Sequence, residues 1–368
     1  MPPDRFPLAL LEQPVSQRLA YFQGYTMAHP RLVDTAHQLM HAIYQPSGAS
    51  LIFIFGPTGV GKSTLLRRIC QKIITDALPD LENNPNRIPI AGIEVIAPEF
   101  SDFSWKEFYL RALKALQEPM LEYKVSPTDT KLKLRMALEH ALHYRQLNAF
   151  YIDEAQNLAK VASGRRLRDQ TDCIKSLASL SGVPFLLCGT YELLMLRNLS
   201  AQLCRRSIDI HLCRYRAESE ADLKVFQSVV QTFQQHLPLA EIPALLPAWE
   251  FFYERSIGCV GILKDWLVRT LCAVLDSNPN AKTCTMRQLE SQAWSAEQCL
   301  LMLAEAREHE RLLLERDTAG ADLRLALGLQ PTAHQQCPSS AQESEAPQPN
   351  RVGQPFPKRR TVGAPQDN

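Results

Sequence analysis

The 368-residue sequence lacks several features that would assign it to a class directly. No apolar run approaches the roughly 18 residues that cross a membrane, and no signal-peptide pattern opens the chain. None of the ten cysteines forms a C-x-x-C pair, which argues against a structural zinc site and suits a reducing compartment. The net charge is only +1, so affinity for nucleic acid would need a local basic patch. We therefore expect a cytoplasmic protein with no membrane partner.

The most informative segment present is a phosphate-binding loop, G-x-x-x-x-G-K-[ST]. An apolar run over 51–55 precedes it, and Thr64 begins a stretch with helical spacing after it, so the pattern stands in the strand–loop–helix setting that gives it a mechanism. The alternative, a chance match in an ordinary loop, lacks that setting. The loop consists of Gly56, Pro57, Thr58, Gly59, Val60, Gly61, Lys62 and Ser63.

Each residue type in this loop has a physical task. Glycines let backbone N–H groups converge on phosphates, and the following helix adds its partial positive charge. Lys62 is expected at the β- and γ-phosphates, and the Ser63 hydroxyl at Mg²⁺. We predict that residues 56–64 bind ATP together with Mg²⁺.

A second half of the site is expected at 149–154, where a buried strand ends in two acids. Asp153 would bind Mg²⁺, directly or through water, and Glu154 would polarise the attacking water. Alone, the pattern would equally suit a solvated Asp-Glu turn. Together with the phosphate loop, it predicts an Mg²⁺-dependent ATPase.

Two further elements are candidates for catalysis. Thr190 ends a predicted strand over 182–190 and could orient water, although it could equally be a turn residue. Arg205 and Arg206 precede another predicted strand, and an arginine supplied by a neighbouring subunit stabilises charge on the transferred phosphoryl group. Their alternative is a solvated helix end.

The order of elements predicts an α/β domain with a parallel sheet, then a helical one. Strands and helices alternate up to residue 216, including a helix opened by the capping box at Ser104 and a basic loop over 160–168. Helices are expected at 218–236, 244–256, 261–277 and 285–314, the last opened by a second capping box at Thr285. We expect a lead-in over 1–30, an α/β domain over 31–216, a lid over 217–317 and a disordered Pro/Gln/Ser-rich tail over 318–368.

These features together resemble the AAA+ ATPases, which implies a P-loop core with a five-stranded parallel sheet and a small all-α lid. The segment 256–267 looks like the family's second sensor, which would bring Lys264 to the γ-phosphate, although many members carry Arg there.

Within that class the chain resembles the transposition-regulator ATPases of the TnsC/TniB type, and MuB more distantly. The resemblance covers roughly 15–305 and rests on the stretches Tyr21–Pro30, Asp153–Asn157, Cys188–Thr190, Arg205–Ser207 and Gly258–Leu267. It implies ATP-dependent rings or filaments on double-stranded target DNA, a link between a target-selection protein and the transposase, and disassembly on hydrolysis. Asp-Glu-Ala-Gln also occurs in secretion-type ATPases.

DNA contacts would be made to the phosphate backbone without base readout. Two patches are candidates: Lys160, Arg165, Arg166 and Arg168 after the acidic strand, and Lys106, Arg111 and Lys114 near the helix after the second predicted strand (90–97), to which Lys131, Lys133 and Arg135 could add. The cluster 358–360 in the tail could contact DNA or a partner. Charge runs are also often plain solvated faces.

Other functions remain open at this level. A replication-initiator or helicase-loader ATPase would share every nucleotide motif, although no winged-helix pattern follows the lid. A secretion or signalling ATPase would bind protein through the helical region. A small-molecule kinase fits least, because it has no use for arginines supplied in trans.

Overall fold

The computed structural model describes residues 5–97, 103–118, 130–160, 165–199, 201–314 and 316–329. The chain forms two compact units, residues 1–313 and 314–368. In the described part no helix is both long and apolar enough to span a membrane. The domain boundaries expected at 30, 216 and 317 stay predictions.

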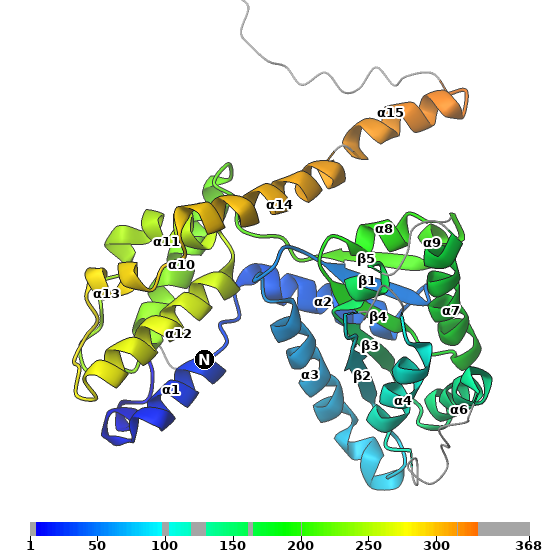
Figure 1. Ribbon diagram of the computed structural model, residues 1–368, viewed down its shortest axis with the longest axis horizontal. Coiled ribbons are helices and arrows are strands. Elements are labelled where there is room, and N and C mark those ends of the chain that lie inside the picture. The colour runs from blue at the N-terminus through cyan, green and yellow to red at the C-terminus, as the bar shows by residue number, and fades with distance from the viewer. Residues whose placement is uncertain are drawn as a thin grey trace, which may run out of the picture. The chain divides into compact units, whose positions relative to one another are not determined.

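The first unit contains one sheet of five parallel strands (Figure 1). The strands are β1 (Leu51–Phe55), β2 (Ile90–Glu94), β3 (Ala149–Asp153), β4 (Phe185–Gly189) and β5 (Ser207–His211), in the order β2-β3-β4-β1-β5. Leu51 pairs with Phe185 on one side and Ser207 on the other, so β4, β1 and β5 begin and end at the same level. The predicted five-stranded parallel sheet is confirmed. Because the strands are parallel, their carboxyl ends all lie at the same end of the sheet.

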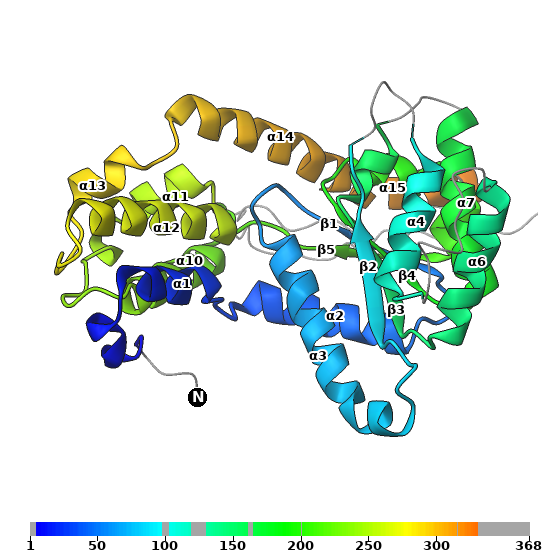
Figure 2. The same ribbon diagram turned by 60° about the horizontal axis from the view of Figure 1, so that its bottom comes forward.

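Helices cover both faces of this sheet (Figure 2). Ile52 and Ile54 pack with α2 (Pro30–Tyr44) and α3 (Lys62–Asn83), whereas Leu51 and Phe53 face α4 (Trp105–Ala115), α6 (Lys131–Tyr144) and α7 (Arg165–Ser181). The strands are apolar on both faces because each face is buried. Two short helices, α8 (Leu193–Arg197) and α9 (Ala201–Arg205), lie between β4 and β5.

The helical region forms a separate core around the fully buried Trp266. Its helices are α10 (Glu220–His236), α11 (Trp249–Ser256), α12 (Val260–Ser277), α13 (Met286–Ser291) and α14 (Ala296–Leu314). The capping box of Thr285 with Gln288 is confirmed. The prediction of one helix over 285–314 is wrong, because Ser295 and Gln298 exchange hydrogen bonds at 3.1 and 3.2 Å and begin a new helix.

The segment before α2 is more ordered than a lead-in. It contains a 3-10 turn at Leu8–Glu12 and the helix α1 (Val15–Gly24), which was not predicted. Phe22 belongs to the core around Trp266, and the buried Arg18 donates to the carbonyls of Pro238 and Pro279 at 2.7–3.1 Å. Pro14 precedes the first turn, where proline is tolerated because that N–H has no helical partner.

Two further expectations need correction. Arg165, Arg166 and Arg168 belong to α7 and not to a loop; residues 161–164 lie outside the described part. A helix, α15 (Arg316–Ala326), occupies the start of the range predicted to be a disordered tail, because that stretch is rich in helix formers and proline first appears at 331. The basic cluster 358–360 lies outside the described residues.

Candidate nucleotide-binding site

The phosphate loop connects β1 directly to α3, as the sequence predicts. Gly61 caps α3 with φ of 108°, a left-handed conformation that favours glycine. Gly56 has no room for a side chain, because a Cβ there would lie 2.1 Å from the carbonyl oxygen of Leu212. The loop therefore needs its glycines, and the first turn of α3 leaves backbone N–H groups directed at the loop, an arrangement that suits a phosphate.

The side chain of Lys62 forms hydrogen bonds back to the phosphate loop. Its Nζ donates to the carbonyl oxygens of Gly56 at 3.0 Å and Pro57 at 2.8 Å. Burial lowers the pKa of Lys62, while nearby acidic groups, including Glu154 and Asp153, act in the opposite direction. A phosphate in the loop would offer this ammonium group an anionic acceptor in place of two neutral carbonyls.

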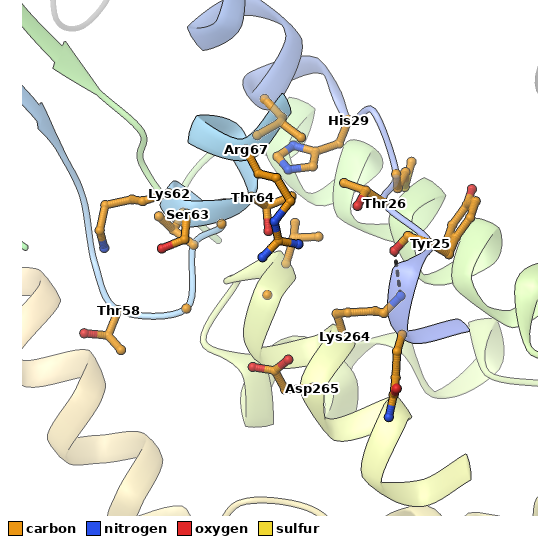
Figure 3. A pocket seen from close by; sticks show the side chains of 18 of the residues that line it. Tyr25, Thr26, His29, Thr58, Lys62, Ser63, Thr64, Arg67, Lys264 and Asp265 are labelled. Atoms are coloured by element: carbon orange, nitrogen blue, oxygen red, sulfur yellow. Dashed lines mark hydrogen bonds between the residues drawn. The ribbon is translucent and has the colours of Figure 1, made fainter. Parts of the chain in front are cut away.

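A cavity of about 560 Å³ opens beside the loop, a size within the range of small-ligand sites (Figure 3). Segments distant in sequence line it: the loop with α3, the start of α12, the stretch between α1 and α2, the residues after β3 and β4, and Phe233 of α10. The side chains labelled in Figure 3 include Ser63, Thr64 and Arg67 from α3, Asp265 from α12, and Tyr25, Thr26 and His29 from the third segment.

The acidic residues and Thr190 come together at the ends of β3 and β4. Glu154 has φ of 52°, and its N–H donates to Asp153 Oδ1 at 3.0 Å. Thr190 lines the same cavity as Glu154, and its buried Oγ1 has no hydrogen-bond partner within the described structure. Between them lies Gln156, whose role the sequence did not indicate.

The oxygen donors of Ser63 and Asp153 suit Mg²⁺, which prefers hard oxygen ligands and a few carboxylates completed by phosphates and water. Ser63 is exposed in the cavity at the start of α3, and Asp153 ends β3 close enough to Lys62 to influence its pKa. The donor set therefore fits the ion that the sequence predicts.

Lys264 has partners other than the phosphate loop. Its Nζ donates to the carbonyl oxygen of Tyr25 at 2.7 Å (Figure 3). It also donates to the carbonyl oxygen of Phe22 and lies 4.2 Å from the Phe22 ring centroid. Burial lowers its pKa to about 8, which Asp265 partly counters. In this structure Lys264 ties the end of α1 to α12, and the contact with a γ-phosphate stays a prediction.

Arg205 and Arg206 lie near the amino-terminal ends of the strands, whereas the phosphate loop lies at the carboxyl ends. The carbonyl of Arg206 accepts from Ser50 N at 2.9 Å, just before β1 begins, whereas the loop follows the end of β1. The five residues of β1 separate these two ends of the sheet by about 17 Å. Both side chains are exposed, and neither reaches the phosphate loop of its own subunit.

The candidate DNA-binding residues lie on several elements. Lys106, Arg111 and Lys114 are on α4, where Arg111 pairs with Glu107 at 3.0 Å. Lys160 is exposed beyond β3, and Arg168 is exposed on α7; Arg165 and Arg166 begin that helix. On α6, which also carries Lys131 and Lys133, Arg135 pairs with Glu139 at 2.9 Å. A role of these residues in DNA binding stays a prediction.

The stretch between α1 and α2 was not recognised as part of the site. His29 is buried, shares a hydrogen bond of 2.9 Å with the Tyr215 hydroxyl, and has its pKa lowered to about 4, mainly by burial. Tyr25 stacks on His236 with ring centroids 3.9 Å apart. Two signals were available in the sequence: the density of aromatic and histidine side chains over 21–29, and the family resemblance of the stretch Tyr21–Pro30.

Residues 44–196 match the family model described as an AAA domain. The structure is similar to the ORC1 protein of Aeropyrum pernix in complex with DNA, with 14% identity, a TM-score of 0.51, and coverage of 72% of this chain and 65% of that one. It is also similar to the ORC2 protein of the same organism (14%, 0.47, 74% and 71%) and to a Walker-type ATPase of Pyrococcus abyssi (15%, 0.43, 78% and 75%). No curated protein sequence gives a significant match.

The AAA match begins just before β1 and ends in α8, so it spans the phosphate loop, both acids and Thr190. The sheet order and the helices on both faces are those of an AAA+ fold. The chain carries an AAA domain over residues 44–196 and is an ATPase.

Proposed function

We propose that this ATPase works on double-stranded DNA as a homo-oligomer, with ATP bound between neighbouring subunits. The observation that carries the proposal is the position of Arg205 and Arg206. They are exposed at the end of the sheet remote from their own phosphate loop, so the phosphates that they could contact are those of a neighbouring subunit. Hydrolysis would then depend on assembly.

Within each site, the residues divide the chemistry of hydrolysis. The loop and Lys62 hold the phosphates. Glu154 accepts a proton from the attacking water while the water oxygen forms a bond to the γ-phosphorus. The bond from that phosphorus to the bridging oxygen breaks, giving ADP and inorganic phosphate, which takes up the proton. Mg²⁺, when bound through Ser63 and Asp153, would neutralise phosphate charge. Thr190 is the candidate for orienting the water through its unpartnered hydroxyl.

The finer assignment is a replication-initiator or helicase-loader type of ATPase. The fold likeness to ORC1, a protein solved in complex with DNA, supports it. DNA would be held by contacts from exposed basic side chains to its phosphate backbone. The candidates exposed in the structure are Arg111, Lys114, Lys131, Lys133, Lys160 and Arg168.

A transposition regulator is the second candidate. The stretch Asp153–Asn157 and the segment 21–30 favour it through their resemblance to that family, and both line or flank the cavity. The described residues after β5 are helical, with no strand to build a winged-helix module. Transposase and a target-selection protein would be its partners.

One experiment separates these candidates. The Glu154→Gln variant, which should bind ATP and not turn it over, is imaged by negative stain with duplex DNA of two unrelated sequences, in the presence of ATP or ADP and with or without an added replicative helicase. Filaments that form with ATP on either duplex favour a transposition regulator. Discrete particles that capture a replicative helicase favour an initiator or loader. Particles whose formation and size are the same with and without DNA would rule out both candidates. That result would point to an ATPase that binds protein in place of DNA.

A further inference from the structure

The side chain of Gln156 joins the two catalytic strand ends. Gln156 is buried in the 3-10 turn η2 (Ala155–Leu158) that follows β3. Its Nε2 donates to Glu154 Oε2 at 2.5 Å, and its Oε1 accepts from the Thr190 backbone N–H at 3.2 Å. The amide orientation is fixed by these partners, because a carboxylate can only accept and an N–H can only donate.

The sheet makes room for this bridge at Gly189. A Cβ on Gly189 would lie 2.2 Å from Gln156 Oε1, so only glycine lets the carboxamide cross the end of β4. Gly189 pairs with Phe55, the last residue of β1 before the phosphate loop. The Gln156 carboxamide therefore lies where β3, β4 and the loop meet, and it lines the same cavity as Glu154.

The turn that carries Gln156 is itself anchored. The neighbouring Asn157 donates from Nδ2 to the carbonyl of Val95 at 2.8 Å, which fixes the turn to the end of β2. Glu154 has a left-handed backbone conformation that a glutamate adopts only when its surroundings enforce it. The turn is thus held on both sides, and the Glu154 carboxylate has one oxygen bound by Gln156.

We propose that Gln156 is a positioning residue for hydrolysis: it holds the Glu154 carboxylate toward the cavity and couples it to the Thr190 strand end. With Oε2 occupied by the amide, Oε1 is the oxygen left to accept the proton of the attacking water. Because Gln156 also accepts the hydrogen bond of the Thr190 backbone N–H, the Thr190 hydroxyl is the group left to contact water or phosphate. This inference rests on the proposed role of Glu154.

The test compares Gln156→Met with Asn157→Leu. Methionine keeps the length of glutamine and removes both hydrogen bonds, whereas Asn157→Leu removes the adjacent buried amide and leaves the Glu154 contact in place. Turnover, KM for ATP, affinity for a fluorescent ATP analogue and the melting temperature are measured for each. We expect kcat of Gln156→Met to fall by about 10- to 100-fold, the scale of a misplaced catalytic group, with KM within about threefold. Asn157→Leu should lower the melting temperature and reduce kcat less than Gln156→Met does, because the hydrogen bond from Gln156 to Glu154 remains.

Gly189→Ala gives a second route, because it displaces the carboxamide without altering Gln156; it should reproduce the loss of kcat. In a double variant with Glu154→Gln, the Gln156 substitution should add no more than about a twofold loss, because the two residues act as one unit. A normal or raised kcat in both Gln156→Met and Gly189→Ala would overturn the inference, and so would losses that add fully to Glu154→Gln. Normal turnover in Glu154→Gln alone would instead refute the proposed role of Glu154, and the inference with it.

Discussion

Gly59 of the phosphate loop and Gly261 of α12 meet backbone to backbone. A Cβ on Gly261 would lie 2.3 Å from the Gly59 carbonyl oxygen, and the next residue, Ile262, donates its N–H to that same oxygen at 3.2 Å. A Cβ on Gly59 would in turn lie 2.4 Å from the Ile262 side chain. Helix α12 thus contacts the phosphate loop without an intervening side chain, so any displacement of the loop would be transmitted to α12.

Gly261→Ala should therefore weaken nucleotide binding and turnover. The added methyl group meets backbone, which cannot rotate away, so α12 and the loop must separate, at a cost of about 1–3 kcal/mol. We expect about tenfold weaker ATP affinity, measured with a fluorescent analogue. Gly24→Ala is the matched control, because a Cβ there meets nothing within 4 Å. Wild-type affinity in Gly261→Ala would contradict a direct coupling of the phosphate loop to α12.

Lys264→Ala should mainly lower stability. The substitution removes two hydrogen bonds to the carbonyls of Phe22 and Tyr25, and the contact with the Phe22 ring. Hydrogen bonds from a charged donor contribute about 1.5–3 kcal/mol each, offset in part because the buried ammonium group is costly, so we expect a net loss of about 1–3 kcal/mol. Urea denaturation measures it, and turnover per folded molecule should change less than threefold. Unchanged stability with lost turnover would instead support the γ-phosphate contact.

Mixing two inactive variants tests the arginines. Glu154→Gln retains Arg205 and Arg206, and the double variant Arg205→Ala with Arg206→Ala retains an intact Glu154. In a head-to-tail assembly, about a quarter of the interfaces in a 1:1 mixture combine an intact loop side with an intact arginine side. We expect the mixture to regain turnover that neither variant shows alone. Additive activities of the separate variants would exclude a site completed by the neighbour.

Acid should destabilise the fold through buried histidines. The pKa values of His29 and His211 are lowered from 6.5 to about 4, mainly by burial. Between those pH values the unfolded chain binds protons that the folded chain does not, so stability is full above about pH 6.5 and declines as pH falls toward 4. Each group contributes up to about 3 kcal/mol. His29→Gln can keep a hydrogen bond to Tyr215, so its unfolding free energy should fall less than wild type between pH 7.5 and 5. Equal pH slopes in the two proteins would contradict the assignment.

The sequence predicted the sheet and the loop because both are encoded locally. Apolar runs bounded by polar turns marked the strands, and the spacing of Lys62 and Ser63 required a strand before the loop and a helix after it. The link through Gln156 could not be predicted in this way, since it depends on two strand ends that are distant in sequence becoming neighbours.

The same reason explains the misjudged N-terminal segment. Prolines at 2, 3, 7 and 14 suggested a loose lead-in, but Arg18 and Phe22 are buried against residues more than 200 positions away. Lys264 was predicted to contact the γ-phosphate because of its position in a motif. In the structure its partners are the carbonyl oxygens of Phe22 in α1 and of Tyr25, which directly follows α1. Local patterns carry no information about such tertiary contacts.

The most direct test of the proposed function is the mass of the assembly on DNA. Analytical ultracentrifugation of Glu154→Gln with a short duplex, at matched protein concentration, compares ATP with ADP, and Lys62→Ala serves as the control that cannot hold the phosphates. We predict large, DNA-containing particles with ATP, smaller species with ADP, and no ATP effect in the Lys62→Ala control. A protein that sediments as a DNA-free monomer in every nucleotide state would contradict the account.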